Sequence, residues 1–222
     1  RDDALTDQVL RGRGLSRDGY VLFLSRLAAA KGADDLIAAY ERSAAREYVD
    51  LVVAGTGPQA GRLRELAAAS PVADRIRFLD DVGDAEKGHL MAGCRAFALP
   101  SKPMPEFVET FGIALVEKLL SGAGPVITTD VGGILEAVGD AAIIVPPGDP
   151  DALAVALEEA VLRFSDDDRA AWQERGRLHA LRFDRGVVLD RILALLPDDA
   201  KPGPEPSLGT RPGRRRRAEV GT

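Results

Sequence analysis

The sequence predicts an α/β protein: a doubly wound, mostly parallel six-stranded sheet with helices on both faces. Short apolar runs alternate with amphipathic segments along residues 20–196. The apolar runs lack the polar alternation of a strand with one solvated face, so each strand is expected to be buried on both faces. Turns rich in glycine, proline and charged residues separate the runs. Regular alternation of strands and helices favours a parallel sheet.

The expected elements follow from these patterns. The predicted strands cover residues 20–24, 51–54, 76–79, 96–99, 125–129 and 142–145. Apolar residues at helical spacing predict helices over 34–43, 62–69, 84–91, 111–121, 134–138, 150–164, 166–181 and 185–196. The last helix carries more apolar residues than one buried stripe requires, so exposed apolar surface is expected on it.

Both ends of the chain differ in composition from the body. Residues 1–18 are polar and charged and are interpreted as a linker or incoming connection, which leaves 19–196 as one domain. Residues 197–222 combine prolines, glycines and an arginine run, which predicts a disordered tail. Since the chain begins with Arg1 instead of Met, we expect it to be part of a longer protein.

Charge and composition exclude several function classes. The chain has 222 residues and a net charge of −6, while the tail from Pro197 holds six basic and four acidic residues. The body is therefore more acidic than the whole, which argues against nucleic-acid binding. One cysteine and two histidines argue against disulfides and a structural zinc site. No apolar run approaches the roughly 18 residues of a membrane span, and a cytoplasmic location is expected.

The stretch from Glu109 to Glu117 is the most suggestive for chemistry. Thr110 is a candidate N-cap for the following helix, and Gly112 allows a ligand to approach the backbone. First-turn amides and the helix dipole favour a phosphate there. Glu109 is expected at the mouth of the site and Glu117 two turns into the helix, roughly 10 Å along its axis at about 1.5 Å per residue. This layout suits a nucleotide-sugar, although solvated glutamates on an ordinary helix explain the stretch about equally well.

Other candidate groups also follow strands. The cations Arg26 and Lys31 flank the loop after the first strand and could neutralise a diphosphate. Residues 55–60 match the dinucleotide pattern G-x-G-x-x-A, but they follow the second strand instead of the first, so a tight structural turn is the preferred interpretation. In a parallel sheet these loops share the rim beyond the carboxyl ends of the strands, where ligands bind.

Taken together, these segments resemble the C-terminal, nucleotide-sugar-binding domain of the retaining glycosyltransferases of family 4 (group 1), which has a GT-B fold. The similar segments, in the family's order, lie at 23–27 with Lys31-Gly32, 53–58, 99–101, 109–117, 124–127, Gly132-Gly133 with Glu136, and 145–150. They cover about residues 20–165. Ser25 stands where the family usually has glycine.

The resemblance implies roles for individual residues. Arg26, Lys31 and Glu109 would be the catalytic set: the two cations would hold the donor diphosphate, and Glu109 would face the transferred sugar. Glu106 is a second candidate for the sugar-facing acid. The implied binding residues are Ser25, Gly55, Val82 beside the base, the amides of Phe111, Gly112 and Ile113, and Glu117 on the ribose hydroxyls.

The expected activity is transfer of a sugar, with retention, from a nucleoside-diphosphate sugar to an unknown acceptor hydroxyl. The resemblance implies no cofactor and no metal. It implies an N-terminal acceptor-binding domain or partner chain, which this sequence lacks, and an acceptor at the membrane periphery is among the expected partners. Two alternatives stay open: a nucleotide-sugar-binding module without activity, and an NAD-dependent oxidoreductase that uses residues 55–60.

Overall fold

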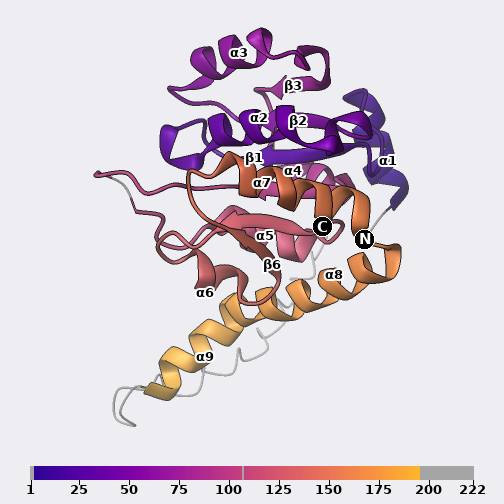
Figure 1. Ribbon diagram of the computed structural model, residues 1–222. Helices are drawn as coiled ribbons and strands as arrows, with labels where there is room; N and C mark the ends of the chain where they lie inside the picture. The colour runs from indigo at the N-terminus through magenta and orange to yellow at the C-terminus, as the bar shows by residue number, and fades with distance from the viewer. Residues whose placement is uncertain (1–2, 107, 196–222) are drawn as a thin grey trace, which may run out of the picture. The chain divides into compact units, whose positions relative to one another are not determined.

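The computed structural model describes residues 3–106 and 108–195 and contains a six-stranded sheet whose neighbouring strands are all parallel. The strands lie in the order β3-β2-β1-β4-β5-β6 (Figure 1). They are β1 (Tyr20–Leu24), β2 (Asp50–Ala54), β3 (Ile76–Leu79), β4 (Ala96–Leu99), β5 (Val126–Thr129) and β6 (Ala142–Val145). The predicted fold class is confirmed, and each predicted strand agrees with the observed one to within one residue.

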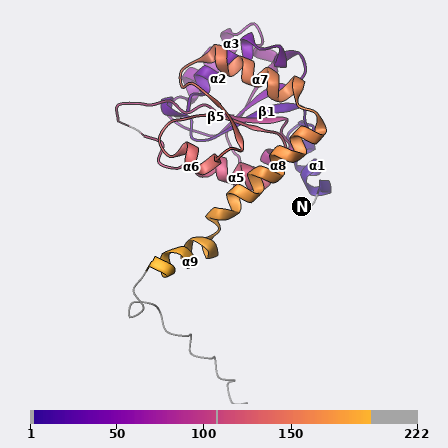
Figure 2. The same ribbon diagram turned by 60° about the horizontal axis from the view of Figure 1, so that its bottom comes forward.

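Helices cover both faces of the sheet. They are α1 (Asp3–Gly12), α2 (Ala33–Arg42), α3 (Ala60–Ala69), α4 (Asp84–Gly93), α5 (Ile113–Ser121), α6 (Ile134–Val138), α7 (Pro150–Glu158), α8 (Asp166–Ala180) and α9 (Arg185–Leu195). Figure 2 shows α2, α3 and α7 on one side of the strands and α1, α5, α6 and α8 on the other. The chain steps outward from β1 to β3, crosses to β4 and then steps outward in the opposite direction to β6. Right-handed connections therefore place α2 and α3 on one face and α5 and α6 on the other.

The core lies around the two central strands. Every residue of β1 and β4 is buried, which explains their unbroken apolar sequences. Tyr20, in β1, is buried and donates its hydroxyl to the carbonyl of Leu90 in α4, at 2.6 Å. Burial raises the pKa of Tyr20 because the phenolate would lose its hydration. A buried hydroxyl of this kind needs such a partner, and the bond ties α4 to the sheet.

The first residues do not form the linker that their polarity suggests. Residues 3–12 form α1, which packs against α4 and buries Leu10 and Thr6. The Thr6 hydroxyl lies 2.9 Å from Nδ1 of His89, on α4. Thr6 and Leu10 are four residues apart and therefore share one helix face. This i,i+4 pair indicates a helix with one buried face, but the charged composition of the segment led to the interpretation as a linker.

The predicted helix over 150–164 is divided in the structure. Its α-helical part, α7, ends at Glu158, and residues 159–163 form a π-helical segment. Pro150 begins the helix, and Asp149 caps it by accepting hydrogen bonds from the amides of residues 151 and 152. A proline in the first turn costs no intrahelical bond, so this start follows from the sequence. The wider π turn has no counterpart in the sequence pattern.

The described chain divides into two units, residues up to Asp184 and residues from Arg185 onward. Within the second unit, α9 has no buried residue, and its Leu189, Ile192 and Leu195 side chains are exposed. The predicted excess of apolar surface on this helix is therefore confirmed for its described residues. The predicted disordered tail, 197–222, lies outside the described residues. Across residues 3–106 and 108–195, none of the helices has the length and apolar character to cross a bilayer.

Candidate functional site

The loops at the carboxyl ends of the strands form a cavity of about 290 Å³. Its lining includes Ser25 and Arg26 after β1, Gly55 after β2, Val82 after β3, Lys87 on α4 and Glu117 on α5. Five of these six residues are candidates from the sequence. Segments that lie up to about ninety positions apart in the chain therefore meet around one volume, because all the strands end at the same edge of the sheet.

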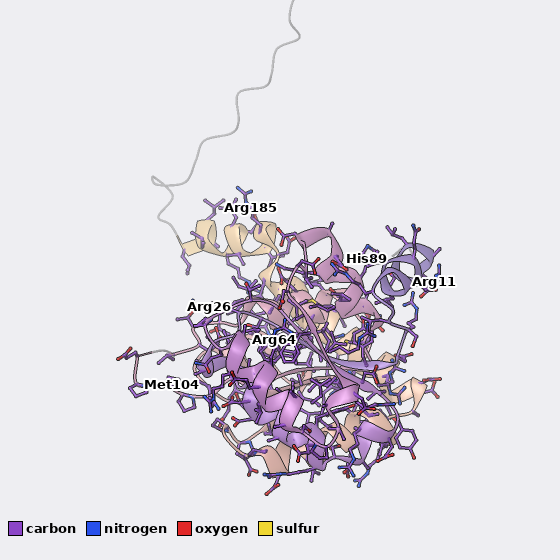
Figure 3. All side chains as sticks on the ribbon, turned by 90° about the horizontal axis from the view of Figure 1, so that it is seen from above. Arg11, Arg26, Arg64, His89, Met104 and Arg185 are labelled. Atoms are coloured by element: carbon purple, nitrogen blue, oxygen red, sulfur yellow. The ribbon has the colours of Figure 1, made fainter. Side chains whose placement is uncertain are left out.

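The loop after β1 is held by its neighbour. The amide of Ser25 donates to the carbonyl of Ala54 at 3.2 Å, and the amide of Leu27 donates to that of Thr56 at 2.8 Å. Between these two anchors the Arg26 side chain is exposed and makes no hydrogen bond or ion pair within the described part of the chain. The guanidinium thus has all its donors available on a backbone that is fixed on both sides. Figure 3 shows Arg26 and Met104 on the same side of the molecule, away from His89 and Arg11.

The second predicted cation is arranged differently. Lys31 ends a short 3₁₀ turn, and its ammonium group binds the carboxylate of Glu109 in a largely buried ion pair. Glu109 is only 7% exposed. The structure therefore brings Lys31 and Glu109 together, and Glu109 does not line the cavity beside Glu117.

Glycines position the main chain of Glu109. Its carbonyl accepts a hydrogen bond from the amide of Gly133 at 2.9 Å. A Cβ on Gly132, whose φ is +59°, would lie 2.0 Å from the same carbonyl oxygen. Any side chain at position 132 would push the Glu109 segment away. The glycine pair in the loop after β5 therefore supports the carboxylate that holds Lys31, in addition to shaping a turn.

The start of α5 differs from the prediction. The helix begins at Ile113, and its N-cap is Gly112 with φ +82°, so Thr110 is not the cap. Residues 109–112 precede the helix, so Glu117 does not lie two turns, roughly 10 Å, into it as expected. The left-handed backbone at Gly112, which only glycine adopts easily, turns the chain there. Sequence spacing alone could not distinguish this turn from a continuing helix.

Glu117 lies in the wall of the cavity. It is exposed on α5, and its carboxylate faces the same volume as Gly55 and Val82. Among the described residues its carboxylate has no hydrogen-bond partner. The carboxylate can therefore accept bonds from a ligand without first giving up an internal one.

Three further predicted residues lie outside this cavity, in addition to Lys31 and Glu109. The ring of Phe111 packs edge-to-face on Phe183 at 4.8 Å, which makes its side chain part of the packing beneath α5. Gly112 is buried at the helix start, and the Ile113 side chain is 68% exposed. The prediction for all three concerned their amides, and that prediction stays untested.

Lys87 lines the cavity and was missed by the sequence analysis. It lies in the first turn of α4 and binds Asp84 at 2.8 Å, three residues earlier. The Asp84 hydrogen bond raises the pKa of Lys87, with a smaller contribution from the charge of Glu117, so the ammonium stays protonated. The sequence feature that could have identified Lys87 is the position of this cation immediately after the loop that follows the third strand. Within the described residues, no three His, Cys, Asp or Glu side chains gather as metal ligands would.

Comparisons with known proteins show the family to which the chain belongs. The family profile of the group 1 glycosyl transferases matches residues 12–179. A phosphatidyl-myo-inositol mannosyltransferase of Mycolicibacterium smegmatis is 33% identical over 187 residues, which are 81% of this chain and 45% of that protein. An O-antigen chain mannosyltransferase B of Escherichia coli is 30% identical over 182 residues, 79% of this chain and 45% of its own length. The chain thus spans about half the length of the curated relatives it matches.

Solved structures show the same fold. The crystal structure of Anabaena HepE in complex with UDP-glucose matches with a TM-score of 0.74 and 22% identity, over 87% of this chain and 52% of that one. At that identity the likeness concerns the fold alone, a Rossmann-like unit that spans about half of the matched chain. The profile match extends over most of the chain and includes all the loops that form the cavity. With relatives at 30% identity or more over about four fifths of its length, the chain is a member of the group 1 glycosyl transferases.

Proposed function

We propose that this chain is the donor-binding half of a retaining glycosyltransferase and that it holds a nucleoside-diphosphate sugar in the cavity at the strand ends. The main support is the convergence of Arg26, Gly55, Val82 and Glu117 on one volume of about 290 Å³. A cavity of this size lies at the lower end of the range for small-molecule sites. Family membership supports sugar transfer over the oxidoreductase alternative, since the profile covers the same loops.

Each group is assigned a part of the donor. The carboxylate of Glu117 accepts hydrogen bonds from the ribose hydroxyls, and Val82 lies along the base. Arg26 binds the diphosphate as a bidentate fork, because its guanidinium has no internal partner in the described chain. Lys31, positioned by its ion pair with Glu109, is the second cation assigned to the diphosphate. Ser25 and Gly55 form the wall between these groups.

The chemical contribution is stabilisation of the leaving group. When the sugar–oxygen bond breaks, negative charge accumulates on the departing diphosphate. Arg26 and Lys31 oppose that charge, and prearranged cations of this kind are a large source of rate enhancement. The acceptor hydroxyl is supplied through an N-terminal domain or a partner chain, a proposal that fits the coverage of about half of each curated relative.

The test compares Glu117 with a matched surface glutamate. Glu117→Ala removes charge-assisted hydrogen bonds worth about 1.5–3 kcal/mol, so binding of the free nucleoside diphosphate should weaken about ten- to a hundredfold. Glu65→Ala, on the exposed face of α3, should leave binding unchanged. Calorimetry with UDP, GDP and NAD on the parent and both variants makes the comparison. Equal affinities for Glu117→Ala and the parent, or preferential binding of NAD, would contradict the proposal.

A further inference from the structure

The segment that precedes α5, residues 109–112, packs against the glycine loop after β5. The amide of Gly133 donates to the carbonyl of Glu109 at 2.9 Å. A Cβ on Gly133 would lie 2.0 Å from the carbonyl oxygen of Thr110, so the loop and the segment meet backbone to backbone. Because Glu109 belongs to this segment, any displacement of the segment would also displace the ammonium of Lys31, which Glu109 binds.

An aromatic pair also holds this segment. The ring of Phe111 packs on that of Phe183 with centroids 4.8 Å apart and ring planes at 76°. Phe183 ends the 3₁₀ turn Leu181–Phe183, directly after α8. Edge-to-face pairs of aromatic rings favour a defined orientation, so each ring restrains the other. Phe183 does not line the cavity at the strand ends, and any effect that it has on a ligand there must pass through its neighbours.

The end of α8 supports the glycine loop as well. α8 packs against both α5 and α6 (Figure 2). In the last turn of α8, Nε2 of His179 lies 2.9 Å from the carbonyl oxygen of Glu136 in α6, and because a carbonyl only accepts, this nitrogen donates. A Cβ on Gly139, just after α6, would lie 2.5 Å from the same imidazole ring. The His179 ring in turn packs on Phe183 at 5.6 Å. The rings at the end of α8 therefore contact both the helix after the glycine loop and the segment before α5.

We propose that Phe183 is a positioning residue for diphosphate binding. Its ring restrains Phe111, and through the backbone of the segment it keeps Glu109 where its carboxylate holds Lys31. The proposal rests on the proposed function, which assigns Lys31 to the diphosphate. Glu117, assigned to the ribose, lies on α5, which packs along its own length against α4 and α8. Loss of the Phe183 ring should therefore weaken the phosphate contacts and leave the ribose contact in place.

The experiment compares Phe183→Leu with Phe164→Leu. Both side chains are half-buried, and the ring of Phe164 packs on Trp172 at 5.4 Å without lining the cavity, so a general loss of aromatic packing affects both variants. Calorimetry measures the affinities for UDP and GDP, and a saturation-transfer NMR titration measures those for uridine and guanosine. The same ligands are measured on Lys31→Met with and without Phe183→Leu. Should Phe183→Leu fail to fold, Phe111→Leu breaks the same contact from its other side.

Phe183→Leu should weaken diphosphate binding about threefold to tenfold, within the range for coupled neighbours. Nucleoside binding should stay unchanged, Phe164→Leu should bind every ligand as the parent does, and Phe183→Leu should have no further effect once Lys31 is Met. Equal weakening of nucleoside and diphosphate, an equal loss in Phe164→Leu, or a full effect in the Lys31→Met background each overturns the proposal, as does an unchanged diphosphate affinity.

Failure of the parent to bind any of the four ligands counts against the proposed function instead. Urea denaturation then tests the positioning of the ion pair without a ligand. Phe183→Leu and Lys31→Met should lower stability by less together than the sum of their separate effects, because both act on the same pair. Strictly additive losses would overturn the link from Phe183 to Lys31.

Discussion

The contact between Lys31 and Glu109 changes the roles that the sequence suggests for both residues. As isolated sequence positions they are a cation and a carboxylate, each expected to face a ligand. In the structure their side chains bind each other and are 16% and 9% exposed. Removing one partner of an ion pair that is largely shielded from water is costly, because the remaining charge is left unpaired where water solvates it poorly. The first role of Glu109 is therefore to fix Lys31.

This coupling can be measured with a double-mutant cycle. Glu109→Gln and Lys31→Met should each lower the free energy of unfolding, and the double variant should lose less than the sum of the two. The expected coupling energy is about 0.5–3 kcal/mol, as for residues in direct contact. Urea denaturation of the four proteins provides the values. Strictly additive losses would mean that the pair does not interact in solution.

At the scale of elements, α1 shows that a segment of charged composition can form a packed helix. Arg13, just after the helix, donates from Nε to Oε1 of Glu86 at 2.6 Å and from another nitrogen to Asp81 at 2.7 Å. These bonds join the segment after α1 to α4 and to the loop beside the cavity. They hold the pKa of Asp81 below its usual range, chiefly through the hydrogen bond from Arg13. α1 and the residues after it therefore stabilise α4 and the loop after β3, both of which border the cavity.

A pair of leucine substitutions tests whether α1 is a packed helix in solution. Leu10 is 1% exposed and Leu5 is 44% exposed on the same helix. Leu10→Ala should lower stability by about 2–5 kcal/mol, the range for truncating a buried leucine. Leu5→Ala, with the same change in composition and helix propensity, should cost much less. Chemical denaturation compares them, and equal small effects would restore the interpretation of residues 1–18 as a linker.

A second element-scale prediction concerns pH and the start of α8. Ser165 and Asp168 form a capping box, and the hydrogen bond from Ser165 lowers the pKa of Asp168. A lowered carboxyl pKa in the folded state stabilises the fold above the unfolded pKa of about 3.9 and is lost as pH falls through the folded value. The parent should thus melt above Asp168→Asn at pH 6, and the two curves should converge as pH falls below about 4. A pH-independent difference would rule out this linkage.

At the scale of the whole molecule, the division at Asp184 separates a folded α/β unit from α9. The exposed apolar side chains of α9, among them Leu189 and Ile192, are unusual for a surface helix. We expect this helix to take part in self-association or in binding an N-terminal partner domain. Light scattering of the chain should show a mass that rises with concentration.

The matched variants for this experiment change charge on the same helix. Leu189→Lys with Ile192→Lys should keep the chain monomeric, because charged side chains oppose burial of the face. Arg191→Lys, an exposed position on α9, should associate as the parent does. A parent that remains strictly monomeric at high concentration would contradict self-association and leave the partner domain as the remaining expectation.

The sequence by itself determined the order, type and near-complete extent of the strands. Buried parallel strands are short continuous apolar runs between glycine and proline turns, so their boundaries are local properties. The rim location of the loops that hold Arg26, Gly55 and Val82 also followed, because strand direction in a parallel sheet assigns every following loop to one edge. Exposure of the apolar side chains of α9 followed from an excess over one buried stripe.

Only the tertiary structure decided which side chains meet. The Lys31–Glu109 pair joins residues from two loops, and neither loop's sequence specifies its distance from the other. The start of α5 at Ile113 depends on a left-handed turn at Gly112, and the segment before it is anchored by Gly133 on another loop. Lys87 enters the cavity because α4 packs beside α5. Such contacts are long-range, and packing across the sheet selects among conformations that local sequence patterns leave equally acceptable.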